Sequence, residues 1–338
     1  MGSNDTPRIL IETIVRKTLK DIKASPRRST RNLVDMALNF SEGRFQRNFF
    51  ETAQKMLENG QSPYYALIQD TVAHVDTERL LQFGMNLGYN GCTVGAKKIR
   101  ETEEKEHYNI PWMLSFYFGP EQLPGDCQTY QSAISAGEKL GIHVWMLKPE
   151  GCAQEALALV REHRKSAFAL FCSPQEITEE FLREVREINN LMIVVHYGKD
   201  MEAACRKLRE NGLLYALHYT YTQEETEKIL DGGMFEEMQQ LYPAVSMLSA
   251  APGCPENIKE EIYEYVKKAR EEQLFRTVVW EADYDSLLVD GIISQDAALA
   301  WFDTEGCLVT LEGRKEGADF RLSQRSLPDI LKQAFPKK

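Results

Sequence analysis

The chain has 338 residues, of which 43% are hydrophobic and 27% are charged, a composition typical of a globular protein. No apolar run reaches the roughly 20 residues of a membrane span, so we expect no membrane partner. The net charge of −11 argues against nucleic acid as a partner. The seven cysteines include no CxxC or CxxxC pair, which predicts a cytoplasmic protein without a local thiolate metal cluster.

The N-terminal part of the chain predicts helices only, and we interpret residues 1–77 as a helical cap. Ser29-Thr30 are expected to cap one of these helices, and Ser62-Pro63 to begin another. A basic cluster of Arg27, Arg28 and Arg31 indicates a solvated face or an intramolecular contact with the acidic barrel. It also supports an alternative function, in which the helices bind a protein partner.

From residue 80 onward, short apolar runs alternate with amphipathic helical patterns. The predicted strands are 80–88, 110–118, 143–149, 167–173, 191–198, 214–221, 244–250 and 277–283. This alternation requires parallel strands joined by helices, so we predict an α/β fold of the (β/α)8 TIM-barrel type over residues 78–290. A partial, six-stranded open barrel with two added strands is the near alternative. A doubly wound sheet is disfavoured because the first turn lacks the GxGxxG spacing.

The remaining residues, 291–338, predict a small appendix rather than a domain. Apolar runs at 298–304 and 307–311 flank Glu305-Gly306 and predict a β-hairpin. A last helix is expected at 327–335.

Ligands of such a barrel bind at the carboxyl ends of its strands, so polar residues there are the candidate ligand-binding residues. They are Asn86 and Asn90 after the first predicted strand, Gly119 and Glu121 after the second, His196 and Tyr197 after the fifth, and His218 and Tyr219 after the sixth. Two histidines thus fall at the same height on neighbouring strands.

These two histidines also support a metal-dependent alternative. His196, His218 and Glu281 could ligate a divalent metal or act as acid and base. Lys148 is either an imine-forming lysine or a rim lysine that reaches water. Cys172 is expected to be a small buried residue rather than a nucleophile.

The stretch LGYNGCTVGAKK, residues 87–98, combines Gly88, Gly91 and Gly95 with a single cysteine, Cys92. It lacks the Gly-Lys-Ser/Thr of a Walker loop. Three interpretations remain open: backbone amides that hold an anion at a helix start, the remnant of an iron–sulfur loop, or a tight turn without chemistry.

Three stretches carry a resemblance to a known family. A strand, a loop and a helix are predicted for LLQFGMNLGYNGCTVGAKKI. A strand and a glycine turn are predicted for SFYFGPEQL. A hairpin and a closing helix are predicted for LAWFDTEGCLVTLEGR and FRLSQRSLPDILKQAF. Over residues 78–335 the chain resembles radical S-adenosylmethionine proteins with a SPASM-type extension. That family has a CxxxCxxC cluster loop after its first strand and a Gly-Gly-Glu-Pro turn, which holds the methionine end of the cofactor, after its second.

The chain departs from the family's pattern in its cysteines. The cluster loop has Cys92 alone, and the tail has Cys307 alone. A [4Fe–4S] cluster of this kind needs three protein thiolates to leave one iron for S-adenosylmethionine. The resemblance therefore implies a degenerate, cluster-free barrel in which only Gly119 and Glu121 carry over as cofactor-binding positions.

The expected function follows from these observations. We expect a barrel that binds a small molecule or a peptide at its mouth, or that acts as a non-catalytic partner of an active enzyme. No cofactor is expected, with S-adenosylmethionine or a divalent metal as alternatives. The helical N-terminus resembles caps found on relatives in anaerobic gut bacteria. Whether the chain is an enzyme is left open.

Overall fold

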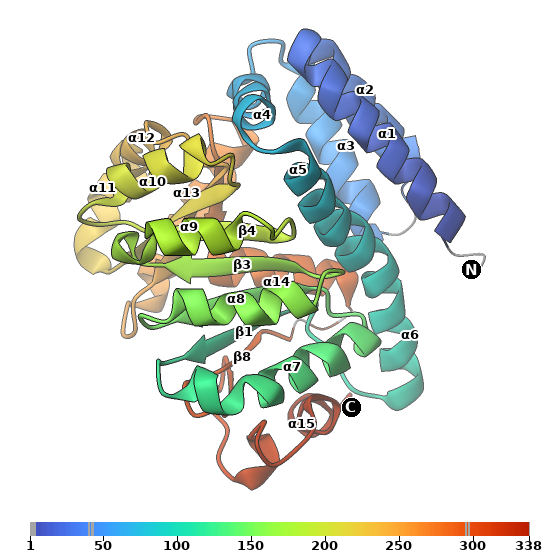
Figure 1. Ribbon diagram of the computed structural model, residues 1–338, viewed down its shortest axis with the longest axis vertical. Helices are drawn as coiled ribbons and strands as arrows, with labels where there is room; N and C mark the ends of the chain where they lie inside the picture. Colours follow the sequence, from blue (N-terminus) through green and yellow to red (C-terminus); the bar gives the residue numbers. More distant parts are fainter. Residues whose placement is uncertain (1–4, 40, 42–43, 295, 297, 338) are drawn as a thin grey trace. The chain divides into compact units, whose positions relative to one another are not determined.

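The computed structural model describes residues 5–39, 41, 44–294, 296 and 298–337 (Figure 1). The chain forms two compact units. Unit 1 comprises Met1–Ser41, Gln46–Leu81 and Val194–Asp285, and unit 2 comprises Glu42–Phe45, Gln82–Ile193 and Ser286–Lys338. These boundaries differ from the three predicted segments, 1–77, 78–290 and 291–338, which stay a prediction.

The N-terminal part is helical, as predicted. Its helices are α1 (Asp5–Ala24), α2 (Pro26–Asn39), α3 (Arg44–Glu58), α4 (Pro63–His74) and α5 (Thr77–Gly84). The Ser62 side chain accepts a hydrogen bond from the Tyr64 amide and Pro63 opens α4, as predicted. The predicted cap at Ser29-Thr30 is wrong: α2 already begins at Pro26, whose fixed φ suits a first helical position, and both residues lie buried inside the helix.

Polar contacts link these helices to one another and to the rest of unit 1. The Arg209 guanidinium contacts both carboxylate oxygens of Asp70 on α4, at 2.6 and 2.8 Å. Arg31 on α2 donates from Nε to the Tyr65 hydroxyl at 2.6 Å, and its guanidinium lies over the Tyr65 ring. Arg27 lies over the same ring. Part of the basic cluster is therefore used within the chain.

The first predicted strand, 80–88, is wrong. Its residues form the end of α5 and the start of an 11-residue π-helix, η1 (Met85–Gly95), which continues into α6 (Ala96–Glu106). The Ala96 amide donates to the Gly91 carbonyl, five residues earlier, which is the π-helical pattern.

Two features of the sequence explain the π-helix. Its buried residues recur every five positions, at 85–86, 90–91 and 95–96, so one face of a wide helix packs inward. Asn86 and Asn90 donate to backbone carbonyls of residues 164–166 and so bind this face to the segment before the third strand. Gly91 lets this face approach the Val144 side chain, and Gly95 lets it approach the Gly141 backbone. The apolar run was thus a helix face and not a strand.

Seven strands then alternate with helices. The strands are β1 (Met113–Phe118), β2 (Val144–Pro149), β3 (Ala167–Cys172), β4 (Leu191–His196), β5 (Tyr215–Tyr221), β6 (Val245–Ala250) and β7 (Val278–Glu281). The helical elements between and after them are α7 (Gln122–Leu140), α8 (Ala153–Glu162), η2 (Pro174–Glu176), α9 (Glu179–Val185), α10 (Met201–Glu210), η3 (Gln223–Glu225), α11 (Thr226–Leu230), α12 (Gly233–Gln239), α13 (Glu256–Glu271) and α14 (Ala282–Ile293). The predicted α/β class is confirmed. Among the described residues, this alternation has one strand fewer than the eight of a complete barrel, which agrees with the partial barrel.

The tail completes the sheet of unit 2. It holds β8 (Ala300–Phe302), β9 (Leu308–Thr310), β10 (Gly313–Arg314), η4 (Ala318–Phe320) and α15 (Leu327–Ala334). β8 and β9 pair antiparallel, which confirms the predicted hairpin, and β8 also pairs parallel to β1. The strand order in this unit is β10-β9-β8-β1-β2-β3.

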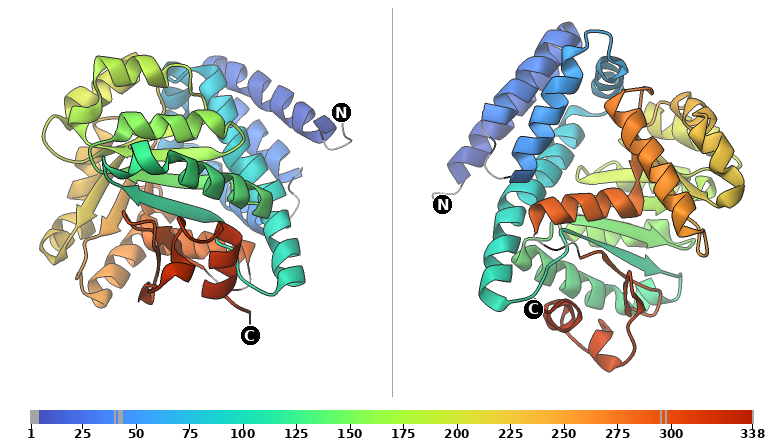
Figure 2. Two further views of the ribbon diagram at one scale, coloured as in Figure 1. Left: turned by 60° about the horizontal axis from the view of Figure 1, so that its bottom comes forward. Right: turned by 180° about the vertical axis from the view of Figure 1, so that it is seen from behind.

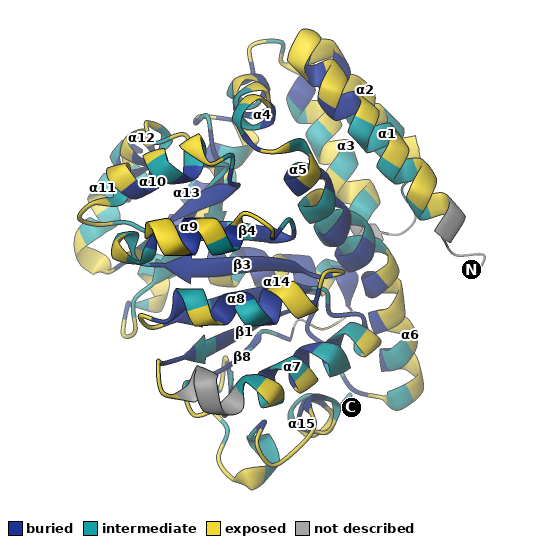
Figure 3. Ribbon diagram, in the orientation of Figure 1, coloured by how far each residue is buried: buried dark blue, intermediate teal, exposed yellow. Residues whose placement is uncertain are grey.

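The two faces of the unit 2 sheet differ sharply. Leu114, Trp145 and Phe168 point to a face that is completely buried. Helices α7 and α8 lie on this side of the sheet (Figures 1 and 3), and Gly137 of α7 directly contacts the Trp145 ring. On the opposite face, side chains become more exposed toward the carboxyl ends: Met113 and Ser115 are buried, whereas Tyr117 is half-buried.

Unit 1 repeats this arrangement in β5, β6 and β7, which are parallel (Figure 2). Leu217, Leu248 and Val279 lie on its buried face. Helix α13 contributes Ile262, Val266 and Ala269 to the core, where all three are buried. His218 and Trp280 point to the other face. Alternation along each strand therefore separates an apolar core from a face that carries polar groups.

The π-helix generates a prediction about packing. Replacing Gly95 with alanine would place a Cβ against the Gly141 carbonyl oxygen and 2.6 Å from the Asn90 carbonyl oxygen. We expect Gly95→Ala to lower the free energy of unfolding by about 2–3 kcal/mol, because both obstacles are backbone atoms. In Gly88→Ala, the matched control in the same π-helix, the new Cβ meets no atom within 4 Å. That variant should gain up to about 1 kcal/mol. Equal stabilities in urea unfolding would contradict the close approach.

Candidate functional site

Two histidines and a serine form a hydrogen-bonded chain at the carboxyl ends of β4, β5 and β6. His196 Nδ1 lies 3.1 Å from His218 Nδ1, and His218 Nε2 lies 2.6 Å from Ser249 Oγ. The imidazole rings meet edge to face, with centroids 5.2 Å apart. His218 is 5% exposed, whereas His196 and Ser249 are half-buried. The sheet thus leaves His196 and Ser249, the two ends of the hydrogen-bonded chain, accessible to a ligand.

The chemistry of this hydrogen-bonded chain of side chains follows from the number of protons that it carries. A neutral imidazole carries one N–H, so a bond between two Nδ1 atoms requires one ring to donate and the other to accept. When His218 donates from Nδ1, its Nε2 accepts the Ser249 proton. When His196 donates instead, His218 Nε2 donates to the serine oxygen. The chain can therefore present either a donor or an acceptor to a ligand, and it can pass a proton.

Apolar side chains share the face of the sheet on which His218 lies. His218 pairs in register with Met247 on β6, which pairs with Trp280 on β7. Thr220 pairs with Ser249 one step closer to the carboxyl ends. This row offers apolar surface next to a hydrogen-bonding group, a combination typical of small-molecule sites.

The predicted tyrosines lie on the other face. Tyr197 follows His196 and Tyr219 follows His218, so alternation turns both rings away from the histidines. The rings contact each other at 5.1 Å between centroids, and the Tyr197 hydroxyl donates to Glu237 at 2.6 Å. Burial raises the pKa of Tyr197 to about 12, with Glu237 acting in the same direction. The predicted set therefore divides into histidines on one face and tyrosines on the other.

Glu281 also lies away from the histidines. It pairs with Leu248, which pairs with Tyr219, so it belongs to the tyrosine face. The structure therefore does not bring together the predicted metal ligands His196, His218 and Glu281. In the described ranges, no group of three His, Cys, Asp or Glu side chains could hold a metal ion.

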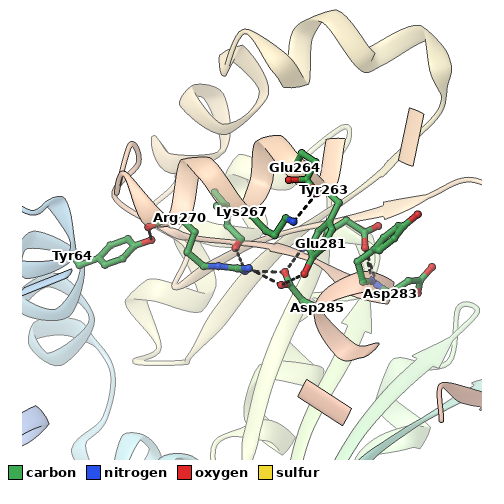
Figure 4. A network of polar contacts seen from close by, with 10 residues as sticks. Tyr64, Tyr263, Glu264, Lys267, Arg270, Glu281, Asp283 and Asp285 are labelled. Atoms are coloured by element: carbon green, nitrogen blue, oxygen red, sulfur yellow. Dashed lines mark hydrogen bonds and ion pairs between the residues drawn. The ribbon is translucent and has the colours of Figure 1, made fainter. Parts of the chain in front are cut away.

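Glu281 instead belongs to a polar network at the start of α14 (Figure 4). Its carboxylate accepts hydrogen bonds from the amides of Asp283 and Tyr284, at 3.0 and 2.9 Å. Asp285 accepts from the Glu281 amide and binds the Arg270 guanidinium at 2.6 and 2.8 Å. Burial raises the pKa of Glu281 to about 7, although the Tyr284 amide favours the ionised form. These contacts assign Glu281 a helix-capping role.

Asn86 and Asn90 lie far from any strand's carboxyl end. They bond to carbonyls that precede β3, at its amino-terminal end, and Asn86 is completely buried. Their selection as ligand residues depended on a first strand that does not exist. Cys92, between them and Gly95, has its pKa raised to about 12 by burial. The glycine-rich stretch is a packed helix.

Because the predicted strand 80–88 is a helix, the turn at Gly119 follows a different strand from the one predicted. Gly119 and Glu121 follow the first strand, β1, and not the second. Glu121 is exposed at the start of α7. In the order of the strands, this turn occupies the place that the resemblance gives to the cluster loop. Cys127 is the cysteine of this region, and burial raises its pKa.

Cys172 and Lys148, the other two candidates, lie on opposite faces of the sheet. Cys172 is completely buried and burial raises its pKa well above the ordinary range, which confirms the expected small buried residue. Lys148 lies on the more open face and donates to the Tyr117 hydroxyl at 2.7 Å. Ser249 was not among the predicted ligand residues. Its position at a strand end was the available signal.

Comparisons with known proteins give no family. No protein-family model matches the sequence, and no curated protein matches it. A crystal structure of Streptococcus suis SuiB is similar, with a TM-score of 0.49 and 9% identity over 70% of this chain and 69% of that chain. SuiB bound to the precursor peptide SuiA gives a TM-score of 0.46 at 9% identity, over 63% of this chain and 62% of that chain.

A third similar structure is the radical S-adenosylmethionine methyltransferase TsrM from Kitasatospora setae, with cobalamin and a [4Fe-4S] cluster bound. Its TM-score is 0.28 at 16% identity, over 38% of this chain and 30% of that chain. Similarities at this level carry no argument about the chemistry of this chain. Separately, none of the helices in the described residues combines the length and the apolar content needed to cross a bilayer.

The pKa of Glu281 predicts a pH dependence. Its pKa is about 7 in the folded state, above the roughly 4.3 of an unfolded glutamate, so only the folded state keeps the proton between these values. Stability should therefore fall as pH rises through this window. From pH 5 to pH 8, we expect wild type to lose about 2–3 kcal/mol more than Glu281→Gln in urea unfolding. Glu271→Gln, at an exposed position of α13, serves as the control and should follow wild type. A parallel pH dependence of Glu281→Gln and wild type would contradict the raised pKa.

Proposed function

We propose that this chain binds a small molecule or a peptide segment at the carboxyl ends of β4, β5 and β6. His196 and Ser249 make the polar contacts, and His218 positions both. The observation that supports this proposal best is the Ser249–His218–His196 chain, because three side chains from three strands converge on one face.

The energetics favour this reading. Hydrogen bonds at a half-buried position compete less with water than those on an open surface, so they contribute more to recognition. Met247 and Trp280 supply apolar contact beside them. Because each histidine can donate or accept, the site suits a ligand with an uncharged polar group such as an amide or a hydroxyl.

We further propose that the chain is a cluster-free relative of radical S-adenosylmethionine proteins, either a binding protein or a non-catalytic partner of an active enzyme. The seven cysteines support this, because they lie on separate segments and all have free thiols. None of the described segments brings three of them together. Stoichiometric iron and sulfide in protein purified without oxygen would contradict the proposal.

A second candidate function is metal-independent catalysis in which Ser249 is the nucleophile and His218 is its base. The 2.6 Å contact between Ser249 Oγ and His218 Nε2 favours it, since a base at this distance can accept the hydroxyl proton. A fluorophosphonate probe tests it directly. Labelling at Ser249 that His218→Gln abolishes would support this function, and the absence of labelling would exclude an activated serine.

The binding proposal predicts a specific loss of affinity. Fragments and dipeptide amides that bind wild type in ligand-observed NMR should bind Ser249→Ala and His196→Gln about tenfold more weakly, the cost of one lost buried hydrogen bond. The control is Tyr219→Phe, which alters the other face at the same height. It should keep wild-type affinity. Urea unfolding checks that each variant is folded. Ligands that bind both site variants as tightly as wild type would place the site elsewhere.

A further inference from the structure

We propose that Lys148, Tyr117 and Ser115 form a second site, in unit 2, which binds the carboxylate of a ligand that carries an apolar group. The site lies on the more open face of β1, β2 and β3. It shares no residue with the histidine chain, so it does not depend on the function proposed above.

Lys148 is a half-buried cation that forms no ion pair with the acidic side chains that the structure describes. Its Nζ donates to the Tyr117 hydroxyl at 2.7 Å and lies 4.8 Å from the Tyr117 ring centroid and 5.0 Å from that of Phe171. Partial burial of an ammonium group is costly unless an anion compensates it. The Tyr117 hydroxyl and the Phe171 ring compensate in part, and a bound anion would complete the compensation.

Ser115 provides the second, independent observation. It lies two residues before Tyr117 on the same face, between Met146 on β2 and Trp301 on β8. It is 8% exposed, and its hydroxyl makes no hydrogen bond to the residues that the structure describes. Its oxygen is not among the sealed polar atoms that lack a partner, so solvent can reach it. A ligand oxygen beside Lys148 could therefore accept the Ser115 hydroxyl proton.

The side chains around Lys148 indicate that the rest of the ligand is apolar. Met146 is 7% exposed and Phe171 is 1% exposed, so the floor of the site is apolar. Trp301 and Tyr117 are half-buried and border it. Exposure on this face increases along β1 and β2 toward the carboxyl ends, where parallel sheets bind their ligands. The apolar group of a ligand would contact these side chains.

The charge of the site favours a monoanion. One ammonium and two hydroxyl donors match one carboxylate. A phosphate dianion would require more positive charge than Lys148 supplies. The Tyr117 hydroxyl accepts from Lys148 and therefore keeps its own proton to donate. A free aliphatic or aromatic acid and the C-terminus of a peptide share this chemistry.

The test compares an acid with its neutral counterpart. Phenylacetate should bind full-length wild type in calorimetry or NMR titration, and phenylacetamide, which lacks the charge, should bind much more weakly. Lys148→Met keeps an unbranched side chain without the ammonium group and should weaken phenylacetate by tenfold or more, on the order of a lost charged hydrogen bond. Tyr117→Phe and Ser115→Ala should each cause a smaller loss. Lys139→Met, at an exposed position of α7, is the matched control and should not change the affinity.

Three results would overturn the proposal: no binding of phenylacetate to wild type at about 10 mM, equal affinity for the acid and the amide, or unchanged affinity in Lys148→Met. The peptide Gly-Gly-Phe, with a free or an amidated C-terminus, separates the two sources of the carboxylate. Tighter binding of the free peptide than of phenylacetate supports the site as a receptor for peptide C-termini. Binding of phenylacetate without the peptide supports it as a site for free acids.

Discussion

The alternation of side chains along parallel strands is the constraint on which the rest of this structure depends. In each unit, helices cover one face of the sheet and bury its central residues, as Trp145 and Leu248 illustrate. The opposite face carries polar groups and, in unit 2, opens toward the carboxyl ends of the strands. Successive residues of a strand point to opposite faces, so a residue's place in this alternation decides whether its side chain lies in the core or can contact a ligand.

This constraint separates residues that are neighbours in the sequence. His196 and His218 belong to one face, while Tyr197 and Tyr219 contact each other on the other face. Glu281 has an acidic side chain at a strand end, yet its register places it on the closed side, where it caps α14. Cys172 ends β3 on the closed side and is core. Lys148, one step from the end of β2, lies on the open side.

The sequence predicts the repeating parts of this fold well and its exceptions poorly. Apolar runs between amphipathic helices locate β1 to β7, because each strand needs one apolar face, and the hairpin follows from Glu305-Gly306. The π-helix was missed because its five-residue period fits neither the helical nor the strand pattern. That error misplaced Asn86 and Asn90 as ligand residues and shifted Gly119 by one strand. Ser249 could not be ranked above other strand-end serines, because its contact with His218 depends on register.

The proton shared by His196 and His218 is the most direct test of the proposed binding face. Long-range ¹H–¹⁵N spectra of protein labelled at its histidines report which ring nitrogens carry hydrogen. The account predicts that, at neutral pH, one of these two rings carries its proton on Nδ1, and that Ser249→Ala shifts the His218 Nε2 resonance. If both rings carry their proton on Nε2 and the His218 resonance is unchanged in Ser249→Ala, the hydrogen-bonded chain of side chains does not form. This result would contradict the account.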